Sequence, residues 1–339
     1  MSIWDSRKKS PFINTKGPLF FSLVDYRNNY FISDDPNRII EFYNGFENRY
    51  QLIQWMKERP KGVANIHEVD GDKDIIVVIP TADINGKYAK ECRENIFRGL
   101  HIIFVESGEY PDPYFNYAHN CNVGIRKAME YNPKWIVVSN DDMEAIDNVN
   151  ILMDNLKNIS NKDYPLVFAN PENNEYYVSR TFIMIHISGI LKFLKRILEP
   201  SSEFGSRMPS YSKQFNYIFF ASSVYVSFKS KLFQQIFRKH ITKFINFSAF
   251  GIFSTEFIKV NGILFDETFI NGFEDTILSL TIESNYETKF INYNIFAHEG
   301  ATLGSPENEV GGYKLRHLRN IVNYIYADTL AIVKRSIEE

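Results

Sequence analysis

Three short apolar runs, each followed by polar residues, most constrain what this chain can fold into. They cover residues 74–80, 101–105 and 135–139, and stretches of helical character near 87–98 and 122–131 separate them. A short continuous apolar run is typical of a strand buried on both faces, and its alternation with helices indicates right-handed βαβ units. The pattern therefore predicts an α/β fold with a Rossmann-like, mostly parallel central sheet flanked by helices.

The third run ends directly in Asn140, Asp141 and Asp142. Ligands of open α/β sheets bind at the carboxyl ends of the strands, so this acidic segment would lie at a binding edge. Two adjacent carboxylates repel each other unless a cation or a shared proton compensates them, which favours a divalent metal that holds a phosphate. An acidic turn that caps the next helix explains the same residues, and this segment alone leaves both interpretations open.

Composition limits the classes of protein that fit this chain. Its 339 residues suffice for a sizeable core in one large domain or two, and a net charge of −3 indicates no general affinity for nucleic acid. Cys92 and Cys121 make no disulfide framework and suit a reducing compartment. The N-terminus lacks an apolar core of signal-peptide length, and the longest apolar stretches are too short to span a bilayer. We expect a soluble, cytoplasmic protein.

The pattern along the chain divides it into three parts. Residues 1–70 read as an N-terminal extension with a helix at 46–57, residues 71–310 hold the α/β domain, and residues 311–339 form a C-terminal helical segment that begins near Tyr313. Within the domain, residues 175–258 are less regular, and we expect a partly helical, basic insertion there.

Positive charge is concentrated in residues 180–243, which carry eleven Lys and Arg side chains against two Glu side chains. Basic amphipathic helices are expected at 193–198 and 229–243, with a strand at 215–228 between them. Such helices are typical of peripheral contact with an anionic membrane, here the inner membrane face. A helix packed on the core with a solvated basic face explains the same pattern. No nucleic-acid partner is expected, because no recognised module accompanies the charge.

Two further polar sites stand at the ends of predicted elements near the C-terminus. Glu274 and Asp275 open a predicted helix, where the helix dipole favours ionised carboxylates, and His298 follows a strand predicted over 289–296. Asp142 and His298 could share a metal ion. A plain helix-start preference also explains Glu274 and Asp275, and a lone histidine at a strand end is more often structural or solvated than a ligand.

The order of these sites along the chain carries a resemblance to a known family. The matching segments are residues 75–81, 103–107, 120–125, 138–142, 265–267 with 272–275, and 297–300. They correspond in order to a first strand and turn, a second strand with an acidic end, an Asn-x-Gly segment, an Asp-x-Asp segment, a Glu-Asp motif and a late histidine motif. In this respect the chain resembles family-2 glycosyltransferases of the GT-A fold, in the rhamnosyltransferase-like branch, over residues 74–142 and 258–320.

The resemblance implies a nucleotide site at the start of the domain. Thr81, Asp83 and Glu106 would line the base and ribose of the donor, and Asn122 and Gly124 would help shape the pocket. The donor would be a nucleoside-diphosphate sugar carrying UDP, GDP or dTDP. Glu106 stands where the family more usually has Asp, so the contact to the base would shift by one methylene.

The resemblance also implies a metal and a catalytic base. Asp142 and His298 would hold Mn²⁺ or Mg²⁺, Asp141 would contact ribose or metal-bound water, and Asp275, next to Glu274 in the Glu-Asp motif, would be an ionised general base. The implied activity is an inverting transfer of the sugar to a hydroxyl of a glycan, a lipid-linked acceptor or a protein-linked acceptor. Asn140 replaces the first Asp of the Asp-x-Asp segment, which weakens the metal assignment.

Two other functions fit parts of the same pattern. A catalytically inactive GT-A-fold protein that binds carbohydrate or nucleotide would keep the fold, although the retained Asp142, Asp275 and His298 argue against it. A sugar-nucleotide pyrophosphorylase would carry a glycine-rich, arginine-bearing loop after its first strand, and residues 80–83 are unlike such a loop.

Overall fold

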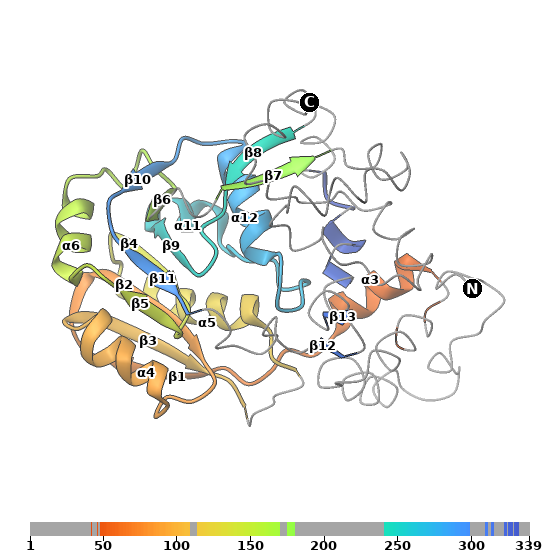
Figure 1. Ribbon diagram of the computed structural model, residues 1–339, viewed down its shortest axis with the longest axis horizontal. Helices are drawn as coiled ribbons and strands as arrows, with labels where there is room; N and C mark the ends of the chain where they lie inside the picture. Colours follow the sequence, from red (N-terminus) through yellow and green to blue (C-terminus); the bar gives the residue numbers. More distant parts are fainter. Residues whose placement is uncertain are drawn as a thin grey trace.

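A seven-stranded sheet forms the centre of the structure, with the strand order β1-β3-β2-β4-β9-β6-β10 (Figure 1). The structure is a computed structural model that describes residues 42, 46, 48–108, 114–169, 175–179, 241–298, 309–310, 313–314, 322–323, 325–327 and 329–331. Helices cover both faces of the sheet, which makes the fold α/β, as predicted.

The three predicted strands form the parallel part of this sheet. β2 (Asp72–Thr81) pairs in parallel with β3 (Leu100–Glu106) on one side and with β4 (Trp135–Ser139) on the other. The predicted βαβ units are thus confirmed. Because β3 and β4 lie on opposite sides of β2, a topological switch point opens at the carboxyl ends of β2 and β4, where ligands of such sheets bind.

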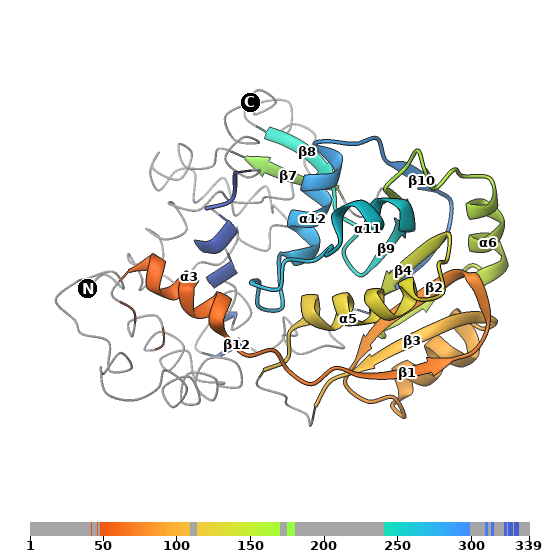
Figure 2. The same ribbon diagram turned by 180° about the vertical axis from the view of Figure 1, so that it is seen from behind.

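Each face of the sheet is covered by its own set of helices (Figures 1 and 2). One face carries α4 (Lys87–Glu91), its π-helical continuation η1 (Cys92–Ile96) and α6 (Val149–Lys157), and the other carries α5 (Tyr117–Met129), α11 (Thr255–Asn261) and α12 (Glu274–Glu283). Strand residues alternate between the two cores: Val77 packs in the first and Val78 in the second. This double burial explains why the strands read as continuous apolar runs.

Strands that the sequence pattern did not predict make the sheet mixed. β1 (Asn65–Val69) runs antiparallel to β3, and β9 (Phe250–Ser254) runs antiparallel to both β4 and β6 (Leu166–Ala169). The other five strands, β3, β2, β4, β6 and β10, run in one direction, so the expectation of a mostly parallel sheet is confirmed, with β1 and β9 as the antiparallel strands. β1 also places residues 65–69 in the sheet rather than in an N-terminal extension.

The single strand predicted over 289–296 is wrong. β10 (Lys289–Ile291) pairs with β6 in the central sheet, whereas β11 (Ile295–Ala297) pairs antiparallel with β5 (Met143–Ala145) in a separate two-stranded sheet. The bend between them is held by Asn294, whose backbone N–H and Nδ2 donate to the Asp147 carboxylate at 2.7 and 2.8 Å. A bond to a residue far away in the sequence thus marks the point where the predicted strand is divided between two sheets.

The predicted helices in the first half are present with shifted ends. α3 (Arg49–Glu58) begins after Asn48, whose side chain accepts the N–H groups of the first turn, and α5 begins at Tyr117 rather than at residue 122 because Asn116 caps it. The helix predicted over 87–98 is α4 continued by η1, and it ends at Ile96.

Two other predictions meet the structure only in part. The helix predicted over 229–243 is wrong at its end, because residues 241–243 lie in β8 (Ile241–Ile245), which pairs with β7 (Glu175–Ser179). The predicted helix at 193–198, the strand at 215–228 and residues 229–240 lie outside the described residues.

The C-terminal segment begins differently from the prediction. Tyr313–Lys314 form β13, which pairs with β12 (Glu309–Val310), so the helical segment does not begin at Tyr313. Residues 322–323 and 325–327 are helical, as predicted. Among the described residues, no helix combines the length and the apolarity needed to cross a membrane.

Candidate functional site

The acidic segment, residues 140–142, lies where the carboxyl ends of β2 and β4 meet. Thr81 at the end of β2 donates from its Oγ1 to Asp141 Oδ2 at 2.7 Å. The Asn140 N–H donates to the Ala249 carbonyl at 2.9 Å, and the Cys92 thiol donates to the Asp141 carbonyl at 3.2 Å. The end of β2, η1 and the turn before β9 therefore hold this segment at the switch point of the sheet.

Both carboxyl groups of the acidic segment sit in surroundings that disfavour their charge. Asp142 is 2% exposed, and its Oδ1 accepts no hydrogen bond from any described residue. Burial raises the pKa of Asp142. Burial also raises the pKa of Asp141 to about 6, against the bond from Thr81 and with support from the Asp142 charge. A buried carboxylate with an unused oxygen is stabilised by a cation, so Asp142 fits a metal ligand.

His298 lies beside Asp142 because β11 pairs with β5. Ala297 is opposite Met143 in this ladder, and the next N–H, that of His298, donates to the Asp142 carbonyl at 2.7 Å. The imidazole is half exposed, and its Nε2 lies 3.6 Å from Glu144 Oε2. The ladder thus brings together two residues that are distant in sequence and that the resemblance assigned to one metal.

The described residues do not form a complete metal site by themselves. No group of three His, Cys, Asp or Glu side chains among them is arranged to hold one ion. Mg²⁺ is commonly bound through one or two protein carboxylates, with substrate phosphates and water as the remaining ligands. Asp142 with its unused oxygen, and His298 beside it, fit that incomplete type of site.

The turn after β2 brings the other acidic residues to the same edge. Glu106 at the end of β3 accepts the Ile84 N–H on Oε1 at 2.9 Å, and its Oε2 lies 3.0 Å from His67 Nε2. The Asp83 N–H donates to Thr81 Oγ1 at 3.3 Å. Thr81, Asp83 and Glu106 therefore lie together, and Glu106 also holds the turn to β1 through His67.

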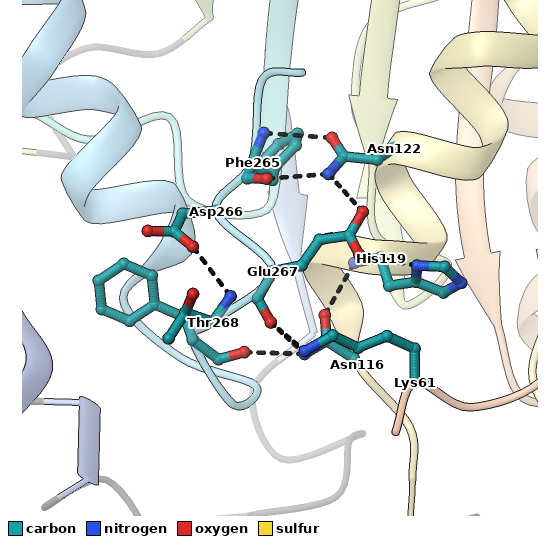
Figure 3. Close-up of polar contacts among 9 residues, drawn as sticks. Lys61, Asn116, His119, Asn122, Phe265, Asp266, Glu267 and Thr268 are labelled. Atoms are coloured by element: carbon teal, nitrogen blue, oxygen red, sulfur yellow. Dashed lines mark hydrogen bonds and ion pairs between the residues drawn. The ribbon is translucent and has the colours of Figure 1, made fainter. Parts of the chain in front are cut away.

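Asn122 and Gly124 lie on α5 and make contacts within the protein interior. Asn122 Nδ2 donates to the Phe265 carbonyl at 2.8 Å, and its Oδ1 accepts the Phe265 N–H at 3.2 Å (Figure 3). A Cβ added at Gly124 would come within 2.3 Å of Val78 Cγ1 and 2.9 Å of Val105 Cγ2. Packing of α5 accounts for both residues, and their role in a nucleotide pocket stays a prediction.

The loop at residues 265–273, which leads into α12, is held by a polar cluster around Glu267 (Figure 3). Glu267 Oε2 lies 2.9 Å from His119 Nδ1, Oε1 accepts a bond from Asn122 at 3.0 Å, and Lys61 donates to the Glu267 carbonyl. The bond from His119, then that from Asn122, lower the pKa of Glu267 to about 2 in spite of burial. Burial lowers the pKa of Lys61 to about 8. This Glu267 cluster fastens the loop to α5.

Asp275 and Glu274 occupy the first turn of α12. Asp275 Oδ1 accepts the backbone N–H and the hydroxyl of Thr276 at 2.6 and 3.1 Å, and its Oδ2 accepts Asn246 Nδ2 at 3.2 Å. Glu274 is buried, and its Oε2 accepts the Gly272 N–H at 2.7 Å. Asp275 is therefore oriented by its neighbours, while Glu274 shapes the turn before it.

The sequence missed several residues that support this site. Asn246 follows β8 and also bonds Ser279 Oγ at 3.1 Å, yet no motif marks it. Cys92 was noted only for its redox state. Tyr117 was missed because the helix was predicted to start five residues later, and the capping preference of Asn116 was the signal that could have corrected this.

Comparisons of the chain with protein-family models, with curated proteins and with solved structures found no match.

Proposed function

We propose that this protein is an inverting, metal-dependent glycosyltransferase that moves a sugar from a nucleoside-diphosphate sugar to an acceptor hydroxyl. The observation that carries the proposal is the β5–β11 ladder, which bonds the backbone of His298 to that of Asp142, a buried residue with an unbonded carboxylate oxygen at the switch point of the sheet. The GT-A variant of the α/β fold is part of this proposal, supported by the β2, β3 and β4 arrangement.

Asp142 and His298 are the residues that would hold Mn²⁺ or Mg²⁺. The ion, when bound, supplies positive charge that offsets the charge on the leaving diphosphate. The burial of Asp142 supports this assignment. An ionised carboxylate with an unbonded oxygen in the interior is energetically costly, and a bound cation would offset that cost.

The nucleotide would lie along the edge formed by Thr81, Asp83, Glu106 and Asp141. These residues end or follow β2, β3 and β4, and Thr81 fixes the Asp141 carboxylate by a direct bond. Because Glu106 is already bonded to Ile84 and His67, we assign it to shaping the base pocket through the turn after β2. A donor carrying UDP, GDP or dTDP fits this assignment.

Asp275 would be the general base that takes the proton from the acceptor hydroxyl. Hydrogen bonds from Thr276 to one carboxylate oxygen and from Asn246 to the other fix the orientation of the Asp275 side chain. A general base must be held in a fixed orientation toward the proton it removes. In-line attack by the deprotonated hydroxyl on the anomeric carbon would break the bond to the diphosphate and invert that centre, through an oxocarbenium-like transition state.

The acceptor and the place of reaction complete the proposal. A glycan or a lipid-linked or protein-linked acceptor would be recognised by the segment at 175–258. We place the reaction in the cytoplasm, with peripheral contact at an anionic membrane surface through the basic residues of 180–243.

The experiment is a donor screen with the purified chain. Incubation with Mn²⁺ or Mg²⁺ and UDP-, GDP- and dTDP-sugars should release nucleoside diphosphate with one donor class. Asp275→Asn should abolish release and keep donor binding by calorimetry, because it removes the proton acceptor and keeps the shape. Asp154→Asn on the exposed face of α6 is the matched control and should behave as wild type. Wild-type turnover by Asp275→Asn would show that the base is another residue.

A further inference from the structure

Tyr117, the first residue of α5, contacts both halves of the candidate site. Its backbone N–H donates to Asn271 Oδ1 at 2.9 Å, and its hydroxyl donates to Asn140 Oδ1 at 2.9 Å. Asn271 lies in the loop that leads to Asp275, and Asn140 begins the acidic segment. One residue thus joins two segments that approach the site from different elements.

The environment of the phenol keeps it a hydrogen-bond donor. Its ring packs edge-on against Phe265, with centroids 6.4 Å apart and an interplanar angle of 90°. Burial first, and then the neighbouring Cys121, Glu274 and Asp275, raise the pKa of Tyr117 well above its usual value. The hydroxyl therefore stays protonated at neutral pH, and it lies within the electrostatic reach of the acidic first turn of α12.

The bond from Tyr117 determines which way the Asn140 amide points. With Oδ1 accepting the Tyr117 hydroxyl, Nδ2 is left as the side-chain donor of Asn140, two residues before Asp142 in the acidic segment. An aspartate at position 140 could also accept the Tyr117 hydroxyl, but it would have no side-chain N–H to donate.

We propose that Tyr117 is a positioning residue that couples the two halves of the site. Through Asn140 it holds the acidic segment that contains Asp142, and through Asn271 it connects that segment to the loop that leads to Asp275. The consequence for sugar transfer rests on the proposed function, whereas the coupling between the two segments does not.

Hydrogen–deuterium exchange measured by mass spectrometry tests the coupling without a substrate. Tyr117→Phe removes only the hydroxyl, and Asn271→Gly removes the loop contact at a position whose φ of 48° suits glycine. Each variant should raise exchange several-fold in peptides covering residues 139–144. The double variant should exceed Tyr117→Phe alone by little, because both changes break the same connection.

The matched control is Tyr131→Phe, two residues after the end of α5, whose hydroxyl donates to Glu68 at 2.6 Å. It should leave exchange at 139–144 unchanged. Unchanged exchange there in Tyr117→Phe would overturn the proposal. Additive effects of the two substitutions would also overturn it, since the loop would then reach the acidic segment by another route.

Turnover separates a positioning role from plain stabilisation. With the donor found in the screen, Tyr117→Phe should lower kcat about tenfold and change the donor KM less than threefold, a loss typical of groups behind the reacting residues. A raised KM with unchanged kcat would contradict positioning. If the wild-type protein turns over no donor, the proposed function fails, and the exchange experiment alone decides the coupling.

Discussion

The acidic segment after β4 and the Glu267 cluster place carboxylates in opposite electrostatic surroundings. In the first, burial raises the pKa of Asp141 to about 6 and also raises that of Asp142. In the second, His119 and Asn122 lower the pKa of Glu267 to about 2. Ionisation therefore lowers the free energy of unfolding in the acidic segment and raises it in the Glu267 cluster.

The two regions also differ in how far protein donors satisfy the carboxylates. Glu267 has both oxygens satisfied by protein donors, so nothing further is needed to keep it ionised. Asp142 keeps a buried oxygen that no described residue bonds, and a cation would satisfy it. Carboxylates whose pKa is raised by burial, as that of Asp142 is, are found preferentially at functional sites.

The largest expected effect comes from removing the charge of Asp142. If the proposed function is right, Asp142→Asn should lower turnover by about 10³-fold, because the proposed ion would lose its carboxylate ligand. It should also leave the unfolding midpoint in urea equal or higher, since an unfavourable buried charge is removed. Asp163→Asn, at an exposed position, is the control for both measurements. A clear loss of stability in Asp142→Asn would instead show that the charge of Asp142 stabilises the fold, as that of Glu267 does.

The two regions should also respond to pH with opposite sign in metal-free buffer. Folded Asp141 holds its proton up to about pH 6, so its contribution to the free energy of unfolding should fall by about 2 kcal/mol between pH 4 and 6. Folded Glu267 releases its proton near pH 2, so its contribution should be complete above pH 4.5 and be lost as pH falls toward 2. Urea unfolding of wild type, Asp141→Asn and Glu267→Gln across pH 3–7, in EDTA, measures both. If the free energy of unfolding of Asp141→Asn still falls by the same amount between pH 4 and 6, Asp141 is not the group responsible and the contrast is wrong.

The smallest expected effect is the loss of stability when the Glu267 cluster is changed at neutral pH. Glu267→Gln keeps the shape but loses the charge-assisted bond to His119, and after allowance for solvent screening it should cost about 1 kcal/mol of unfolding free energy. Glu256→Gln, which loses an exposed pair with Lys259, should leave the urea midpoint unchanged. If Glu267→Gln keeps wild-type stability but no longer binds the donor, Glu267 belongs to the binding site and its role is not structural.

The sequence was informative where a strand is buried on both faces. The runs at 74–80, 101–105 and 135–139 are apolar at most positions because each strand packs on two cores, so the three strands, their parallel pairing and their polar ends could be predicted. β1 was not predicted because it lies at the edge of the sheet, where each of its residues is exposed or only half-buried and leaves no apolar run. The run at 289–296 misled because its division depends on Asp147, a distant residue that bonds Asn294.

What the sequence by itself determined is the βαβαβ half of the domain and the acidic segment at its strand end. These follow from short-range periodicity and from the rule that places strand ends on one edge. Only the tertiary structure decided that His298 meets Asp142, that Tyr117 joins Asn140 to Asn271, and that Glu267 bonds His119. The physical reason is that such contacts, and the burial that shifts a pKa, depend on segments far apart in the chain, which no local pattern encodes.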